Sequence, residues 1–338
     1  MRKGSGFQDA AILVTGGTGS FGNAFADYVL EQHSPQKLII FSRDEMKQWD
    51  MAKKYADDDR VRFFVGDVRD RERLHRAVDG VDFVVHAAAT KIVPTAEYNP
   101  FEAVKTNVMG AMNLIDACID RGVKKVVALS TDKASSPINL YGATKLASDK
   151  MFVAANAYTG AQDTQFSVVR YGNVMGSRGS VIPFFLDRLR SGEPLTITDS
   201  RMTRFMISLQ EGIDLVMRAF ELGQGSEIFV KKIPSMGILD IADAVDPGGA
   251  RQETGIRPGE KLHEQMISPE DSLSTWEFDD HYRILSTLRP SNKELLKAQG
   301  GQPVDEGFTY TSDNNSEWMT SNALRAWIEE NHDLVGKI

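Results

Sequence analysis

The chain has 338 residues, 41% of them hydrophobic and 25% charged, which is the composition of a globular protein rather than a disordered one. Its 39 Lys and Arg against 47 Asp and Glu give a net charge of -8, which argues against nonspecific nucleic-acid binding. A single cysteine, Cys118, excludes an intramolecular disulfide. The N-terminus lacks the apolar run of a signal peptide, and no stretch approaches the ~18 apolar residues of a membrane span. We therefore expect a cytoplasmic protein without a membrane partner.

The first half of the sequence alternates short, β-branched apolar runs with helical patterns. The apolar runs predict strands at residues 11–15, 37–41, 61–65, 81–86, 126–130 and 166–170. Continuous apolar strands separated by helices indicate a parallel sheet covered on both faces. The fold class is therefore α/β, a doubly wound parallel sheet of the Rossmann type.

Proline and glycine interrupt this alternation after Gly172. We assign residues 1–175 to a Rossmann domain that binds NADP, and residues 176–338 mainly to a smaller, C-terminal substrate domain with a tail. Returns to the sheet are expected near 205–232, as a helix at 210–222 and a strand at 227–231. Periodicity is weak from Ser268 to 318–329, where Leu324, Trp327 and Ile328 predict a packed terminal helix.

A glycine-rich turn, TGGTGSFG at 15–22, lies between the first strand and the first helix. Gly16, Gly19 and Gly22 permit, in this order, a tight turn, close approach of a pyrophosphate, and close packing of the helix on the strand. The phosphates would then meet free N–H groups at the helix N-terminus. We expect a dinucleotide to contact Gly16, Gly19, Ser20, Phe21 and Gly22.

The end of the second strand selects between NAD and NADP. The residues there are Ser42, Arg43 and Asp44, with Lys47 one helical turn later. Arg43 can donate two charge-assisted hydrogen bonds to a ribose phosphate, so the sequence favours NADP. The alternative is a solvated helix start in which Asp44 is only a cap. Further along, the ends of the third and fourth strands predict cofactor contacts by Asp67, Val68, Ala87 and Ala88.

Tyr141 and Lys145 are spaced to share one face of a helix. A nearby ammonium, together with a positive nicotinamide ring, would lower the pKa of the tyrosine, which could then remove a hydroxyl proton. Thr131, at the end of the preceding strand, is placed to hold the same substrate oxygen. We expect Tyr141 and Lys145 to contact the cofactor as well.

These features resemble the extended short-chain dehydrogenase/reductases, which act largely on nucleotide sugars. The segments STDKA at 130–134, PINLYG at 137–142, RYGNV at 170–174, TRF at 203–205 and GIRPGEK at 255–261 narrow the likeness. They resemble the inverting UDP-N-acetylglucosamine 4,6-dehydratases, polysaccharide biosynthesis proteins of the pseudaminic acid pathway type. The resemblance implies an NADP-dependent lyase that acts on a UDP-sugar, and a homo-oligomer, either a dimer or a hexamer.

The adjacent residues Asp132 and Lys133 carry the dehydration chemistry in this interpretation. Oxidation at C4 of a hexose acidifies the C5 proton, so a base can remove it while an acid assists loss of the C6 hydroxyl. We expect Lys133 to act as the base, through a neutral amine of lowered pKa, and Asp132 to act as the acid. Retaining dehydratases resemble this site but carry Asp-Glu there. The alternative is a surface ion pair.

The resemblance also implies the residues that bind the UDP-sugar, namely Lys91, Thr131, Asn173, Val174, Arg178, Arg204, Arg257 and Glu260. Lys91 is also a candidate cofactor contact, although Thr90 departs from the larger apolar residue expected beside it. The six histidines show no metal-ligand spacing, so no metal is expected. Two other functions stay open, an NAD(P)-dependent 4-epimerase and a non-catalytic NADP-sensing Rossmann protein.

Overall fold

The computed structural model describes residues 5–177, 179–288 and 292–335. Within these residues one ten-stranded sheet runs through the molecule in the order β16-β14-β15-β10-β6-β5-β4-β1-β2-β3. Its parallel part consists of β1 (Ala11–Thr15), β2 (Lys37–Ser42), β3 (Val61–Val65), β4 (Phe83–His86), β5 (Lys125–Leu129), β6 (Gln165–Arg170) and β10 (Ile228–Lys231). The predicted Rossmann-type α/β fold is confirmed.

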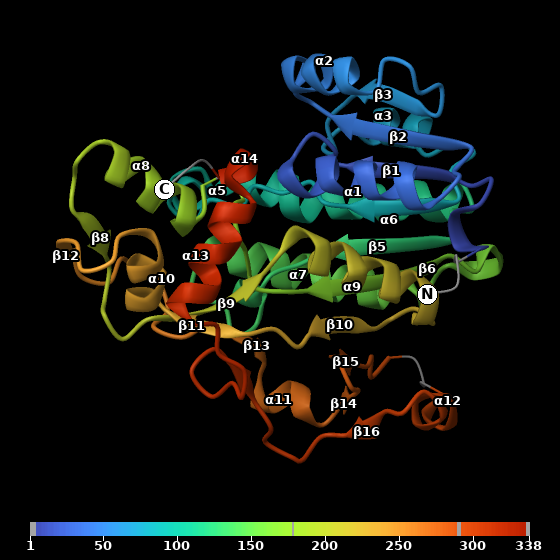
Figure 1. The fold of residues 1–338 in the computed structure, drawn as a ribbon. Helices are drawn as coiled ribbons and strands as arrows, with labels where there is room; N and C mark the ends of the chain where they lie inside the picture. Colours follow the sequence, from blue (N-terminus) through green and yellow to red (C-terminus); the bar gives the residue numbers. More distant parts are fainter. Residues whose placement is uncertain (1–4, 178, 289–291, 336–338) are drawn as a thin grey trace.

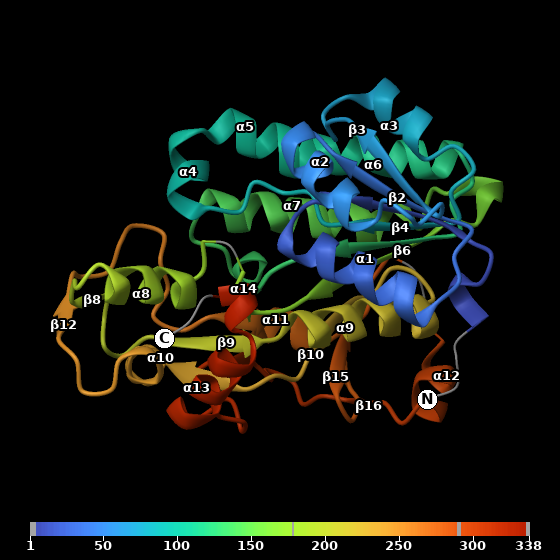
Figure 2. The same cartoon turned by 45° about the horizontal axis from the view of Figure 1, so that its top comes forward.

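Helices cover both faces of the parallel strands. Figures 1 and 2 show α1 (Ser20–Gln32) and α9 (Leu209–Leu222) on one face. The other face carries α3 (Arg71–Ala77), α6 (Gly110–Asp120) and α7 (Leu140–Ala155). Every residue of β1 is buried, because β1 lies between these two layers. This double cover explains why the strands appear in the sequence as continuous apolar runs.

Chain order reverses beside β1, since β2 lies on one side of it and β4 on the other. The connections that leave β1 and β4 therefore run to opposite sides and open a crevice at the carboxyl ends of these two strands, which is where ligands bind in open parallel sheets. The connection from β4 to β5 is long and helical. It contains α4 (Val93–Tyr98), α5 (Pro100–Val104) and a π-helical turn, Lys105–Met109, before α6.

A second, smaller lobe faces the carboxyl ends of the sheet (Figure 1). It has its own hydrophobic core, in which Phe185, Leu186 and Ile241 pack with Leu324 and Ile328. Its elements are β7 (Asn173–Val174), α8 (Val181–Arg190), β8 (Leu195–Ile197), β9 (Thr203–Ile207), β11 (Ser235–Gly237), α10 (Ile238–Val245), β12 (Arg251–Glu253), α13 (Ser321–Glu330) and α14 (His332–Val335). The terminal helix predicted at 318–329 is confirmed as α13.

The sheet also has an antiparallel edge that the sequence did not predict. Next to β10 lie β15 (His281–Ile284), β14 (Thr275–Glu277) and β16 (Gln302–Pro303). Strands this short show no clear alternation in the sequence. They join the sheet in series, because β15 pairs with β10, β14 with β15 and β16 with β14. Chain beyond residue 268 therefore belongs partly to the large sheet. The remaining elements nearby are β13 (Gln265–Ile267), β17 (Tyr310–Thr311), α11 (Pro269–Ser272) and α12 (Lys293–Ala298), whereas α2 (Glu45–Lys54) lies at the opposite edge of the sheet, against β2 and β3.

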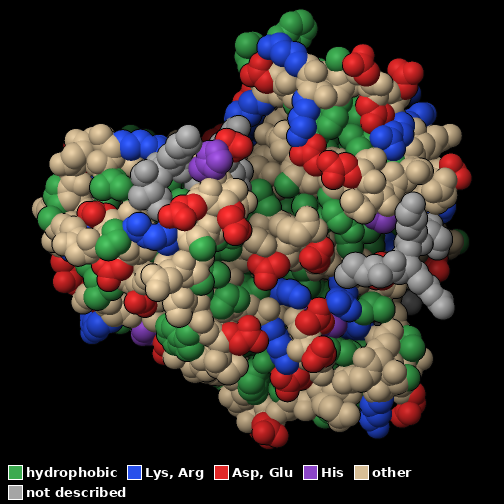
Figure 3. Space-filling view, in the orientation of Figure 1, with side chains coloured by type: hydrophobic (Ala, Val, Ile, Leu, Met, Phe, Trp, Pro, Cys, Tyr) green, Lys and Arg blue, Asp and Glu red, His purple; other side chains and the backbone are tan. Residues whose placement is uncertain are grey.

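Acidic and basic side chains are interspersed over the face of the molecule seen in Figure 3. In the described part of the chain, no helix combines the length and the apolar character needed to cross a bilayer.

Candidate active site

A cleft of about 880 Å³ lies between the sheet lobe and the smaller lobe, at the carboxyl ends of the parallel strands. Residues from both lobes line it, although they are far apart in the sequence. The sequence-predicted residues in its lining are Gly16, Gly19, Ser20, Phe21, Gly22, Ser42, Arg43, Asp44, Lys47, Asp67, Val68, Ala87, Ala88, Lys91, Thr131, Lys133, Tyr141, Lys145, Asn173, Val174, Arg204, Arg257 and Glu260. Arg178 lies outside the described residues, and Asp132 is absent from the lining.

The glycine-rich turn has the close approaches that its sequence predicts. Gly16 has φ +65°, and a Cβ there would lie 2.8 Å from the backbone nitrogen of Ala88. A Cβ on Gly22 would lie 2.3 Å from the carbonyl oxygen of Gly17, which is backbone and cannot rotate away. Because these contacts are with backbone atoms, a side chain at either position would displace the glycine-rich turn that borders the cleft.

The N-terminus of α1 is free to bind an anion. Gly19 is its N-cap and provides no side-chain cap. The backbone N–H groups of the first turn, at Ser20, Phe21 and Gly22, therefore border the cleft with their positive dipole ends directed into it. A dinucleotide pyrophosphate fits this arrangement.

Opposite charges meet at the end of β2. Arg43 is exposed and lies 3.9 Å from Asp67, a long ion pair that leaves most of its guanidinium donors available. Asp44 caps α2 by accepting a hydrogen bond from the Lys47 N–H, and its carboxylate also pairs with the Lys47 ammonium at 2.8 Å. Asp44 is therefore a helix cap, as the alternative interpretation expected, while the Arg43 guanidinium is still exposed and able to bind a phosphate.

Tyr141 and Lys145 lie in the first two turns of α7, where both side chains are buried and border the cleft. Helix α7 begins here because Asn139 accepts a hydrogen bond from the Gly142 N–H at 2.8 Å. Burial raises the pKa of Tyr141 to about 12, although Lys133 and a hydrogen bond with Thr131 act in the opposite direction.

The expected lowering of the Tyr141 pKa by Lys145 is therefore wrong for the protein alone. Burial has the opposite effect on Lys145, whose pKa it lowers, and Asp149 opposes this shift. Desolvation disfavours the charged forms of both residues. In the protein alone, Lys133 and Thr131 lower the Tyr141 pKa by less than burial raises it.

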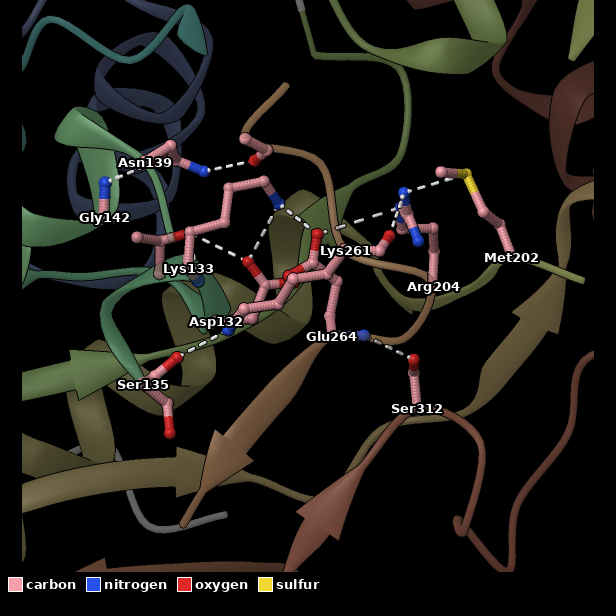
Figure 4. A network of polar contacts seen from close by, with 12 residues as sticks. Asp132, Lys133, Ser135, Asn139, Gly142, Met202, Arg204, Lys261, Glu264 and Ser312 are labelled. Atoms are coloured by element: carbon pink, nitrogen blue, oxygen red, sulfur yellow. Dashed lines mark hydrogen bonds and ion pairs between the residues drawn. The ribbon is translucent and has the colours of Figure 1, made fainter. Parts of the chain in front are cut away.

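Lys133 lies between two carboxylates (Figure 4). Its ammonium nitrogen is 3.1 Å from Asp132 Oδ1 and 3.1 Å from Glu264 Oε1. The chain turns into a 3-10 helix at Asp132–Ala134, so the two adjacent side chains do reach one region, as two adjacent groups on a straight strand would not. Thr131 begins this turn and donates a hydrogen bond to Asp132 Oδ1 at 2.9 Å.

Two expectations about this group need correction. Burial alone would lower the pKa of Lys133, but the charges of Asp132 and Glu264 outweigh burial and raise it, so Lys133 rests as the ammonium. Asp132 has no exposed surface and lies behind Thr131 and Lys133 instead of bordering the cleft. Burial raises its pKa, against the attraction of Lys133 and with added repulsion from Glu264.

A loop from the smaller lobe closes one side of the cleft. It runs from residue 254 to 264 and is fixed to the segment between the 3-10 turn and α7 by two hydrogen bonds, Asn139 to the Gly259 carbonyl at 2.8 Å and Lys261 to the Ser135 carbonyl at 2.7 Å. Arg204, on β9, donates to the carbonyls of Lys261 and Leu262. The structure thus shows Arg204 supporting this loop, and its contact with a nucleotide remains a prediction.

The other predicted substrate residues lie along the far wall of the cleft. Asn173 and Val174 form β7, and Arg257 lies 3.8 Å from Glu260. Lys91 follows Thr90, whose backbone N–H and carbonyl both bond to the side chain of Asn107, in the π-helical turn. This anchor is made by backbone groups, so the identity of the Thr90 side chain matters little for the position of Lys91.

Glu264 is the main site residue that the sequence analysis missed. It is 3% exposed, borders the cleft and contacts Lys133, from which it is separated by 131 positions in the chain. The only sequence signal was a carboxylate three residues beyond GIRPGEK. In the described part of the chain no His, Cys, Asp and Glu residues group to hold a metal, and neighbouring His263 is hydrogen-bonded to Thr203.

Comparison with known proteins agrees with this geometry. A family model described as polysaccharide biosynthesis protein matches residues 12–286. A UDP-N-acetylglucosamine 4,6-dehydratase (inverting) of Campylobacter jejuni is 54% identical, over 94% of this chain and 97% of the relative. The chain belongs to this family of inverting dehydratases. A UDP-glucose 4-epimerase of Rickettsia canadensis is 42% identical, over 91% of this chain and 92% of the relative.

Solved structures share the fold of this family member. The structure of Pen from Bacillus thuringiensis has a TM-score of 0.88 and 36% identity, and covers 97% of this chain and 99% of its own. DesIV, a dTDP-glucose 4,6-dehydratase from Streptomyces venezuelae solved with NAD and TYD bound, has a TM-score of 0.71 at 23% identity, with 96% of this chain and 98% of its own covered. The extended short-chain dehydrogenase/reductase architecture is thereby confirmed.

Proposed function

We propose that this protein dehydrates UDP-N-acetylglucosamine to a 4-keto-6-deoxy sugar with inversion at C5, and that it uses NADP. The observation that carries the proposal is Lys133, held at the cleft between two carboxylates and beside the Tyr141–Lys145 pair. A 4-epimerase needs the Tyr–Lys pair but no second proton-transfer group. The 54% identity to an enzyme named for this dehydration supports the same reaction.

The cofactor would lie along the carboxyl ends of the strands. The first turn of α1 would hold its pyrophosphate, and Arg43 would hold the ribose phosphate that distinguishes NADP from NAD. Asp67 and Val68 would border the adenine, and Ala87 and Ala88 leave room beside the backbone. When bound, the nicotinamide supplies the acceptor for hydrogen from C4 and its donor to C6.

Tyr141 would take the C4 hydroxyl proton, with Thr131 holding the same oxygen. Burial raises the pKa of Tyr141, so the phenolate that acts as the base forms only where nearby positive charge, such as that of Lys133, stabilises it. Lys145 lies on the same helix face. General base catalysis of this kind contributes ~10²–10⁴-fold to the rate.

Dehydration then needs a base at C5 and an acid at C6. Lys133 rests as the ammonium, so it must first release a proton before its amine can act on C5. Asp132 is 3.1 Å away and its pKa is raised, so it is a ready acceptor. One proton transfer between them creates the amine base and the carboxylic acid together. Asp132 would pass its proton to the departing hydroxyl through Thr131 or Lys133, which both border the cleft.

The nucleotide of the substrate would lie against the far wall. Asn173, Val174, Arg257 and Glu260 border it there, and Lys91 borders it from the sheet lobe. Arg257 is exposed and its pairing with Glu260 is long, so its guanidinium is available to a diphosphate.

The decisive experiment is mass and stereochemical analysis of the product formed from UDP-N-acetylglucosamine. Loss of one water, with the L configuration at C5, supports the proposal. A product that keeps its C6 hydroxyl and differs only at C4 identifies a 4-epimerase instead. Absence of turnover, with NADP bound tightly, identifies a binding protein.

A further inference from the structure

Glu264 is mounted rigidly at the cleft. It directly precedes β13, its backbone N–H donates to Ser312 Oγ at 2.9 Å, and its carbonyl accepts from the Ser312 N–H at 2.8 Å. Figure 4 shows its carboxylate directed at Lys133 from the side opposite to the 3-10 turn. Two backbone-linked hydrogen bonds on one residue fix where this carboxylate lies, so its contact with Lys133 is part of the fold.

Asp132, Lys133 and Glu264 form a group with one excess negative charge. The other charged and titratable side chains that interact with it are Arg204, whose Nε is 3.9 Å from Glu264 Oε1, together with Lys261 and Tyr141. Lys133 and Arg204 outweigh burial and lower the pKa of Glu264, whereas burial raises that of Asp132. Glu264 is thus the carboxyl that stays charged.

Each carboxyl has one oxygen without a partner. Asp132 Oδ2 and Glu264 Oε2 are both buried, and no hydrogen-bond donor among the described residues reaches either. Leaving a buried carboxylate oxygen unpaired is costly. A proton on Asp132 removes part of this cost, because it converts one of the two carboxylates to a neutral acid.

We propose that Glu264 is a positioning residue for the dehydration step, holding the Lys133 nitrogen at the cleft beside Asp132 and strengthening its amine as the base that takes the C5 proton. The inference rests on the proposed function and deepens it. Glu264 acts through its neighbours: its charge strengthens the Lys133 amine as a base and disfavours the Asp132 carboxylate.

Every proton that moves in the dehydration step has a donor and an acceptor. The Lys133 ammonium gives its proton to the Asp132 carboxylate, which leaves an amine and a carboxylic acid. The amine then takes the C5 proton of the 4-keto sugar and becomes an ammonium again. The acid passes its proton through the Thr131 hydroxyl to the C6 hydroxyl, the C6–O bond breaks, water leaves and a C5–C6 double bond forms. Glu264 remains a carboxylate throughout.

The test compares E264Q, which removes the charge at constant size, with E264D, which keeps the charge but shortens its reach. S312A is the matched control, because it loosens the mounting of Glu264 without changing any charge. Each protein is given UDP-N-acetylglucosamine and NADP in D₂O, and C4 oxidation, C5 exchange and water loss are followed separately.

In E264Q we expect C5 exchange and water loss to slow at least ~10-fold together, while C4 oxidation and KM stay near wild type. Neutral Gln no longer repels the Asp132 carboxylate, so the acid limb of the pH–rate profile for water loss should move to lower pH. E264D should recover most of the rate, with an acid limb between those of E264Q and wild type because its charge lies farther from Asp132, and S312A should keep the wild-type limb.

An unchanged rate of water loss in E264Q overturns the inference, and so does a slower rate with an unmoved acid limb, which would mean a structural role. If E264Q fails to fold, ¹³C-carboxyl NMR of aspartate-labelled wild type and E264D decides. The Asp132 signal, assigned with D132N, should titrate at lower pH in E264D, and an identical titration overturns the inference. A wild-type product that keeps its C6 hydroxyl overturns the proposed function itself, whatever E264Q does.

Discussion

Gly142 is the point where helix α7 touches the 3-10 turn that carries Lys133. A Cβ built there lies 2.1 Å from the carbonyl oxygen of Lys133 and 3.0 Å from Cβ of Pro137. Real Cβ atoms essentially never come within 3.0 Å of another heavy atom, so the G142A variant must shift the helix or the turn by about 0.9 Å. Because Tyr141 precedes this residue, the shift separates the two proton-transfer groups of the site.

A displacement of this size costs ~10²-fold in turnover when it misplaces a reacting group. Overpacking of a buried contact also lowers the free energy of unfolding by ~1–3 kcal/mol. We therefore expect G142A to fold, with a lower midpoint of urea unfolding and a turnover of UDP-N-acetylglucosamine reduced by about two orders of magnitude.

The matched control is G212A, in helix α9. A Cβ there meets only Tyr171 ring atoms, at 3.9 Å and beyond, which is ordinary contact. Ala is ~1 kcal/mol better than Gly inside a helix, so G212A should be slightly more stable with normal turnover. Near-normal turnover and stability in G142A would refute the close packing of α7 on the turn, and with it the argument for how Tyr141 and Lys133 are aligned.

Four further variants test separate parts of the site and fold. R43D should weaken NADP binding much more than NAD binding in a titration, whereas equal losses would leave only a folding effect. Y141F should keep UDP-sugar binding but lose ~10²–10⁴-fold in turnover, and a near-normal rate would make Tyr141 a packing residue. K133M should slow C5 deuterium exchange and water loss together in D₂O with NADP still bound; dehydration at the wild-type rate would exclude Lys133 as the base. Burial alone would raise the pKa of Asp280, but His281 and nearby cations lower it to about 2. The Asp280 carboxylate therefore stabilises the fold fully above its ordinary pKa of 3.8, and this stabilisation is lost as the pH falls toward 2. D280N should therefore lose less stability than wild type in urea unfolding across that acid range, and parallel curves would contradict the assignment.

The residues that line the cleft at the strand ends could be placed from the sequence, and their contact with a cofactor stays a prediction. These residues lie within one or two positions of a strand end, and a parallel sheet brings all its carboxyl ends to one edge. Gly16, Gly22 and Arg43 could therefore be placed from strand periodicity and local turn chemistry alone. The structure adds the backbone contacts at Gly16 and Gly22 that make glycine necessary there.

Protonation states were predicted poorly, because they depend on burial and on partners from distant segments. The sequence shows that Tyr141 and Lys145 share a helix face, but it does not show that both are desolvated, which raises one pKa and lowers the other. The lowered pKa expected for Lys133 was wrong for the same reason. Its second carboxylate comes from a loop of the smaller lobe.

The sequence by itself determined the Rossmann architecture, the family and the local motifs. The strands and helices follow from the spacing of apolar residues, and the motifs and the family follow from short runs of neighbouring residues. Only the tertiary structure decided that Asp132 is hidden behind Lys133, that Glu264 completes the group, and that β14 to β16 extend the sheet. Electrostatic interactions act through space and change with burial. The contact between Lys133 and Glu264, 131 positions apart, therefore leaves no periodic signal in the sequence, and only the folded structure shows it.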